Sequence, residues 1–149
     1  MRYIDHILQP GETVAYTTTL HWIVYLPAVV LWVVASIALS AGAVAGLVSV
    51  MVALVCALAG SVVGFSAWFR RWTTEVDVTD RRIVYKRGFI RRRTVEMNMD
   101  KVESVDVDQS ILGRMLNYGD ITIRGTGAGL EPLRNIDAPL EFRNHVTAR

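Results

Sequence analysis

The pattern of hydrophobic and polar positions divides the chain into an apolar first part and an alternating second part. After Glu12 the next charged residue is Arg70, so the 57 positions 13–69 carry no formal charge. Within them, residues 22–69 are almost wholly apolar. A helix that crosses a membrane needs roughly 20 apolar residues, so this stretch has room for two such helices and a tight turn.

The apolar stretch therefore predicts a transmembrane helical hairpin, with helices at about 22–41 and 46–69 and a turn at 40–46. Two glycines and a serine among the residues of the turn favour a chain reversal there. A buried helical hairpin of a soluble protein fits less well, because a domain of this size cannot wrap both helices on all sides. A secretory signal peptide also fits less well, because its apolar core of about 7–15 residues is far shorter.

The charges that follow the hairpin predict its orientation. Positively charged residues near membrane-spanning helices remain in the cytoplasm, and Arg70 and Arg71 directly follow the second helix. We therefore expect both termini in the cytoplasm, with residues 1–21 as a short N-terminal cytoplasmic segment. Aromatic side chains at the outer ends of the two helices match the aromatic belt of a membrane interface; they are Trp22, Tyr25, Trp68 and Trp72.

Small residues recur along the second predicted helix at spacings of three and four, which places them on one face: Ala53, Ala57, Gly60, Gly64 and Ala67. Such residues let helices approach closely in lipid. The stripe predicts packing of the hairpin on itself, and self-association with another copy of the chain is the alternative. No acidic or basic residue lies within either predicted helix, which disfavours a transporter.

Beyond the hairpin, apolar and polar residues alternate as they do in half-buried strands. Short runs of this kind predict about six strands, at 74–79, 83–87, 94–98, 102–108, 120–124 and 130–134. Residues 110–117 predict a short helical turn, and 138–146 predict a terminal helix with Asp137 as its N-cap and Pro139 in its first turn. The fold class is thus a membrane protein with a two-helix transmembrane hairpin plus a small, mostly-β barrel or sandwich at 73–149 that ends in a C-terminal helix.

Several stretches of the chain occur in the order and spacing of one known family. The most specific is 109–120, QSILGRMLNYGD, and the others are 8–12, 21–22, 78–84, 88–89 and 102–105. Together they make the chain resemble the bacterial pleckstrin-homology-like (PH-like) domains that flank transmembrane segments, also called membrane-flanked domains. The resemblance implies a barrel-like β domain with a C-terminal helix, anchored in the bacterial cytoplasmic (inner) membrane. It does not by itself imply a catalytic activity.

Residues 70–93 hold nine basic and three acidic residues and form the strongest functional signal. The basic residues of this block are Arg70, Arg71, Arg81, Arg82, Lys86, Arg87, Arg91, Arg92 and Arg93. Anionic lipid head groups attract such residues near a membrane by roughly 1 kcal/mol each, and in PH-like folds a basic loop between early strands often binds phosphorylated head groups. We therefore expect contact with anionic lipids; membrane topology alone is the alternative explanation for these charges.

Other candidate chemistry is weaker. Four acidic residues lack the loop spacing of a calcium site and predict a solvated face or salt bridges: Asp100, Glu103, Asp106 and Asp108. The glycine-rich residues 125–129 lack the Lys-Ser/Thr ending of a phosphate loop and predict a hairpin turn. The histidines and the single cysteine are scattered and form no catalytic or metal-binding pattern: His6, His21, His145 and Cys56.

The sequence therefore predicts a non-enzymatic, multi-pass membrane protein with no metal and no cofactor. Its PH-like domain would serve as a binding or assembly module for protein partners, for another copy of the chain, or for anionic lipids. The modest net charge of +2 gives no indication of nucleic-acid binding. Two alternatives stay open: an accessory subunit of a larger membrane complex, such as an exporter, and, more remotely, a small membrane enzyme.

Overall fold

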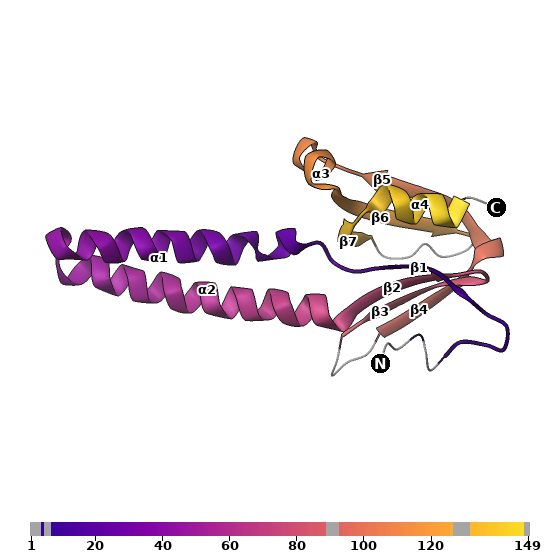
Figure 1. The fold of residues 1–149 in the computed structure, drawn as a ribbon, viewed down its shortest axis with the longest axis horizontal. Helices are drawn as coiled ribbons and strands as arrows, with labels where there is room; N and C mark the ends of the chain where they lie inside the picture. The colour runs from indigo at the N-terminus through magenta and orange to yellow at the C-terminus, as the bar shows by residue number, and fades with distance from the viewer. Residues whose placement is uncertain (1–3, 5–6, 89–92, 127–131, 148–149) are drawn as a thin grey trace. The chain divides into compact units, whose positions relative to one another are not determined.

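A computed structural model of the chain describes residues 4, 7–88, 93–126 and 132–147, with residues 43–45 and 93 described by their backbone alone. The chain forms two compact units (Figure 1). The helical unit is Trp22–Arg71, and the β unit combines Met1–His21 with Trp72–Arg149. The β unit is thus built from two stretches of chain that the helical unit separates in the sequence.

The helical unit consists of the short 3-10 helix η2 (Trp22–Tyr25), α1 (Leu26–Ala45) and α2 (Leu47–Thr73). The turn between the helices is shorter than the predicted 40–46. Only Gly46 separates them, with a φ of 72° that glycine adopts without strain. The helix α1 continues through the predicted turn because its alanines favour helix and because the Ser40 hydroxyl bonds to the Ile37 carbonyl within the helix.

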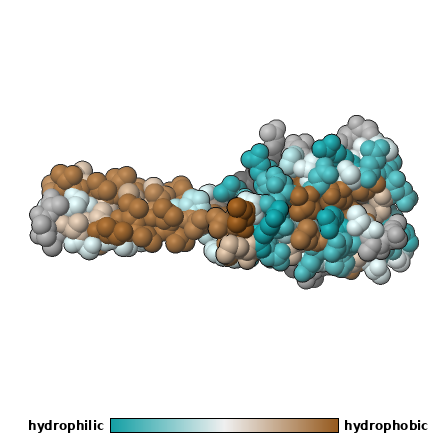
Figure 2. Space-filling view, turned by 90° about the horizontal axis from the view of Figure 1, so that it is seen from above, coloured by the Kyte–Doolittle hydropathy of each residue, from teal (hydrophilic) through white to brown (hydrophobic). Residues whose placement is uncertain are grey.

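Both helices are long and apolar enough to cross a membrane, over Trp22–Gly42 and Leu47–Thr73. Only 11% of the most apolar window of each helix is buried in the structure, and Figure 2 shows a largely hydrophobic surface over the hairpin. In a soluble protein a core hairpin would be buried. A contiguous exposed apolar surface of this kind favours a lipid environment or a partner.

Seven strands form two antiparallel sheets in the described part of the β unit. Sheet A contains, in order, β1 (Val14–Thr18), β2 (Thr74–Thr79), β3 (Arg82–Arg87) and β4 (Arg93–Asn98). Sheet B contains β5 (Val102–Asp108), β6 (Tyr118–Gly125) and β7 (Leu133–Asp137). The remaining elements are the 3-10 helix η3 (Met99–Lys101), α3 (Ile111–Leu116) and α4 (Pro139–Thr147). The prediction of a mostly-β domain with a C-terminal helix is confirmed.

The strand β1 is not predicted by the sequence pattern, which treats residues 1–21 as a separate segment. In the structure Thr18 lies opposite Val76, so β1 is the neighbour of β2 in sheet A. The helical unit is therefore an insertion between two adjacent strands of one sheet. The pattern misses β1 because its partners are distant in sequence: Thr17 and Asp77, whose side chains bond at 2.7 Å, are 60 residues apart.

Two boundaries near the C-terminus also differ from the prediction. The strand β7 begins at Leu133 rather than at 130, which lies outside the described residues. Asp137 is the last residue of β7 and not an N-cap, because its backbone N–H bonds to the Thr19 carbonyl and keeps it in the sheet. Ala138, with a φ of 46°, then turns the chain into α4, which begins at Pro139.

The core of the β unit is apolar and draws on both sheets and on α4. Alternate residues of β2 and of β6 enter it, as expected for strands with one buried face. Its fully or nearly fully buried members are Val76, Val78, Ile83, Tyr85, Ile121, Ile123, Leu133, Ile136, Phe142 and Val146. The core thus joins the strands of sheet A to those of sheet B and to the C-terminal helix in one domain.

Candidate functional site

One end of the β unit is defined by its two connections to the helical unit. The strand β1 ends at Thr18 and β2 begins at Thr74, the residue after α2 ends. Because Thr18 lies opposite Val76 in an antiparallel pair, both connections are at the same end of sheet A. We call this the entry end.

The strand register divides the predicted basic block between the two ends of sheet A. Thr74 lies opposite Arg87, and Arg87 lies opposite Arg93, so both arginines are at the entry end. Arg81 and Arg82 belong to the turn and strand start at the opposite end, where Arg82 lies opposite Asn98. The block is continuous in sequence but not in space, because the chain reverses between β2 and β3.

The remaining basic residues lie close in sequence to the entry end. Lys86 lies opposite Glu75 on β2 and is half-buried. Arg70 and Arg71 are in the last turn of α2, and the Arg71 guanidinium lies 5.9 Å from the centre of the Tyr25 ring, within cation–π range. Arg91 and Arg92 lie outside the described residues.

Arg82 is a mostly buried residue of sheet A whose guanidinium is held by other groups of the protein. Its Nε and Nη2 atoms donate to the two carboxylate oxygens of Glu12, at 2.9 and 2.8 Å. Its Nη1 atom donates to Glu96 at 2.8 Å, and Nη2 also donates to the Ile7 carbonyl. With these partners and a side chain only 12% exposed, Arg82 is not available to a lipid head group.

Glu12 is fully buried in its side chain, and its surroundings keep it ionised. Burial by itself would raise the pKa of its carboxyl. Hydrogen bonds from Arg82, from the Gln9 backbone N–H and from the Thr79 hydroxyl outweigh burial and lower the pKa to about 2. No local pattern in the sequence predicts this pair, although Glu12 and Arg82 lie in two of the stretches that carry the family resemblance.

The small-residue stripe of α2 lies against α1 in the helical unit. Ala53 and Ala67 are buried, as are Ala28 and Ala35 on α1. A Cβ atom added at Gly60 would lie 3.0 Å from the Trp32 ring, and one at Gly64 would lie 3.4 Å from the Ala28 Cβ atom, while Ala57 is half-buried. These contacts support packing of the hairpin on itself; self-association through the same stripe stays a prediction.

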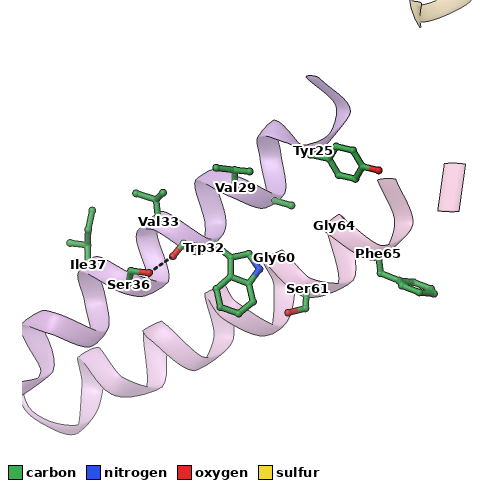
Figure 3. Close-up of a pocket in the computed structure, with 11 residues that line it drawn as sticks. Tyr25, Val29, Trp32, Val33, Ser36, Ile37, Gly60, Ser61, Gly64 and Phe65 are labelled. Atoms are coloured by element: carbon green, nitrogen blue, oxygen red, sulfur yellow. Dashed lines mark hydrogen bonds between the residues drawn. The ribbon is translucent and has the colours of Figure 1, made fainter. Parts of the chain in front are cut away.

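A groove of about 620 Å³ runs between α1 and α2 (Figure 3). Its walls are mostly apolar, and Figure 3 shows the Trp32 ring beside Gly60 and Ser61. The Ser36 and Ser61 hydroxyls bond to backbone carbonyls of their own helices. The groove therefore suits an acyl chain or another helix better than a polar ligand.

The predicted interfacial aromatics are at the outer ends of the two helices. Trp22, Trp68 and Trp72 each have about half or more of their surface exposed. Tyr25 is half-buried beside Arg71. This combination of exposed indole rings and neighbouring arginines is typical of a membrane interface.

Where they are described, the candidate acidic residues are exposed and the histidines stack on tyrosine rings. Asp106 pairs with Arg124 at 2.9 Å, and Asp100, Glu103 and Asp108 are exposed. His21 stacks on Tyr118 and His145 stacks on Tyr16, while His6 lies outside the described residues. Within the part of the chain that the structure describes, no three His, Cys, Asp or Glu side chains are grouped for a metal ion.

A model of the family described as Bacterial PH domain matches residues 22–149. The chain belongs to the bacterial PH domain family. This confirms the resemblance seen in the sequence, and the match covers the helical unit as well as the strands that follow it. Searches of curated proteins and of solved structures found no match. The family indicates a binding or assembly module.

In this bacterial PH domain the motif at 109–120 is required by the fold. A Cβ atom at Gly113 would lie 2.6 Å from the Tyr118 carbonyl oxygen, and one at Gly119 would lie 2.6 Å from that of Asp108. Real Cβ atoms do not approach oxygen so closely, so only glycine fits at either position. These glycines shape the connection between β5 and β6 that contains α3.

Proposed function

We propose that this bacterial PH domain is a membrane-anchored, non-enzymatic binding module whose entry end contacts anionic lipid head groups on the cytoplasmic face. The observation that carries the proposal is the strand register, which brings Arg87 and Arg93 to the end of the β unit where the chain arrives from α2. We assign the hairpin to the bilayer, in a bacterial cytoplasmic (inner) membrane, with both termini in the cytoplasm.

The direct connection between α2 and β2 supports the assignment of the hairpin to the bilayer. Since β2 begins directly after α2 ends at Thr73, no linker separates the domain from the second apolar helix. Arg70 and Arg71 in the last turn of α2 would face the head-group layer, as positively charged residues do at cytoplasmic helix ends. Arg87 lies opposite Thr74, the first residue after α2, so the strand register brings it next to the point where the chain leaves the membrane helix.

A comparison of two exposed arginines can distinguish specific lipid contact at the entry end from a general effect of positive charge. Arg87 and Arg81 are both exposed and both close to the ends of β3. Arg87 is at the entry end and Arg81 at the opposite end. Only Arg87 should contact lipid if the entry end faces the membrane.

The test uses the full chain in mild detergent with mixed phosphatidylglycerol and phosphatidylcholine, and native mass spectrometry to count retained lipids. We expect Arg87→Ala to lower the preference for phosphatidylglycerol about fivefold, as the loss of one interfacial charge implies. Arg81→Ala should leave the preference unchanged. Equal losses in both variants, or no loss in either, would reject the proposed contact.

A second candidate function is assembly with another copy of the chain or with a larger membrane complex. It is favoured by the apolar groove of Figure 3, whose mostly apolar lining could receive a second helix. Size-exclusion chromatography with light scattering on the detergent-solubilised chain tests it. A stable homo-oligomer or a co-purifying membrane protein supports assembly, and a monomer leaves lipid recognition as the function.

A further inference from the structure

The short helix α3 displays an unusual amount of exposed apolar surface in the β unit. Four of its six residues are large, apolar and exposed: Ile111 by 81%, Leu112 by 62%, Met115 by 76% and Leu116 by 39%. Their spacing of one and four residues places them on one side of the helix. On the other side Gly113 is buried against the sheet.

The helix α3 is held firmly in this position. Ser110 caps its start, its hydroxyl accepting a bond from the Gly113 N–H at 3.0 Å. Asn117 ends it in the left-handed conformation with a φ of 58°. The Gln109 side chain donates to the Tyr118 carbonyl at 3.0 Å. The apolar side chains are therefore displayed by a helix that is capped at both ends and hydrogen-bonded to its neighbours.

The helix α3 also lies at the entry end of the β unit. Tyr118, two residues after α3, stacks on His21 with ring centres 5.1 Å apart. The His21 backbone N–H bonds to the Asn135 carbonyl, which fixes His21 beside β7 of sheet B. Since His21 is the last residue before the helical unit, α3 sits where the chain leaves the β unit for its first apolar helix.

Two arginines line a cavity of about 450 Å³ beside α3. Arg114 belongs to α3 and Arg143 to α4, and both are exposed. The other lining residues are uncharged: Val107, Gln109, Asn117 and Leu140. Among the described residues, neither guanidinium makes an ion pair or a hydrogen bond. The cavity thus offers two cationic donors without a neutralising carboxylate in its wall.

We propose that α3 is a lipid-inserting wedge, whose four apolar side chains enter the bilayer interface while Arg114 and Arg143 bind lipid phosphate groups. The inference rests on the proposed membrane anchoring and adds a second, apolar contact to the basic one. An apolar ridge flanked by cations matches the layering of a bilayer, where phosphates lie just above the acyl chains. A bilayer surface is the occupant that the connection of this end to the apolar helices makes available.

The test places an environment-sensitive fluorophore at three positions of the full chain in nanodiscs that contain nitroxide-labelled phosphatidylcholine. The first is the native Cys56 in α2, which reports on the hairpin. The second is Met115→Cys and the third is Glu103→Cys, each in a Cys56→Ala background. Glu103 is exposed at the start of β5, at the end of that strand away from α3, and serves as the matched control.

We expect strong quenching by the lipid nitroxide at positions 56 and 115 and little at position 103. Quenching at 56 with a water-exposed, unquenched probe at 115 would overturn the wedge and leave the anchoring intact. A probe on Cys56 that is not quenched by the lipid nitroxide would reject the membrane anchoring itself. A probe at 115 that is shielded in a concentration-dependent way, but not quenched by lipid, would assign α3 to a contact between copies and would also overturn the wedge.

The phosphate contact has its own test in the full chain. Arg114→Gln and Arg143→Gln together should lower retention of phosphatidylglycerol relative to phosphatidylcholine, by about fivefold per arginine. Arg134→Gln, an exposed arginine on β7 outside the cavity, is the matched control. Unchanged retention in the double variant, or an equal change in the control, would remove the arginines from the proposal.

Discussion

The Arg82 guanidinium donates two hydrogen bonds to the Glu12 carboxylate, of 2.9 and 2.8 Å, although the two residues are 70 positions apart in the chain. Glu12 precedes the helical unit and Arg82 follows it. The pair therefore joins the segment before the hairpin to the sheet after it. Thr79, which donates to the same carboxylate at 2.7 Å, completes the buried cluster.

Removing one member of this pair should strongly destabilise the β unit. We expect Arg82→Met or Glu12→Gln to lower the free energy of unfolding by about 3–5 kcal/mol, because each leaves a buried charge or polar group without its partner. Denaturant unfolding of the detergent-solubilised chain, followed by circular dichroism of the β signal, measures the loss. Arg81→Ala, next in sequence but exposed, should change stability little; an equal effect there would contradict a specific role for the pair.

The depressed pKa of Glu12 predicts a loss of stability in acid. A carboxyl with a folded-state pKa of about 2, against an ordinary value of 4.5, binds protons more weakly when folded. The stability that ionised Glu12 contributes to the folded state is fully present above pH 4.5 and is lost as the pH falls from there toward 2. Thermal unfolding between pH 6 and pH 3 should show a steeper decline for the wild type than for Glu12→Gln. Parallel curves for the two proteins would mean that other carboxyls dominate acid unfolding.

The orientation of the hairpin can be measured with reporter fusions. We expect a fluorescent-protein reporter to be active at both termini and a phosphatase reporter, which works only outside the cytoplasm, to be active when inserted at Gly46. The reason is the cluster of arginines after α2 and the absence of charge in the turn. A phosphatase-active C-terminus would overturn the topology.

The packing of the hairpin should depend on Gly60 more than on Gly64. A Cβ atom at Gly60 would meet Trp32 and Leu31 at 3.0 and 3.2 Å, whereas one at Gly64 would be in ordinary contact at 3.4 Å. We expect Gly60→Ala to lower the thermal midpoint of the helical signal, and the matched Gly64→Ala to leave it nearly unchanged. If light scattering instead shows that Gly60→Ala dissociates an oligomer without lowering that midpoint, the stripe serves self-association.

Local patterns were enough to predict much of this protein from its sequence. An almost wholly apolar, uncharged stretch such as residues 22–69 can form little other than buried or membrane-crossing helices, so the hairpin follows from composition and length alone. Strict alternation identified β2 and β5 to the residue, because a strand with one buried face repeats every second position. The family resemblance came from short motifs that were each visible within a few residues.

Only the tertiary structure decided the relationships between residues that are far apart in the chain. The strand β1 and the Glu12–Arg82 pair both span the inserted hairpin, and no local pattern encodes a partner at that distance. The strand register of sheet A divides the basic block of residues 70–93: Arg87 and Arg93 lie at the entry end, whereas Arg82 lies at the opposite end. The exposure of α3 also depended on the fold. The sequence predicts a short helical turn at 110–117 but not which side of it is buried, and the structure buries Gly113 beside Tyr118 and leaves the apolar side chains exposed.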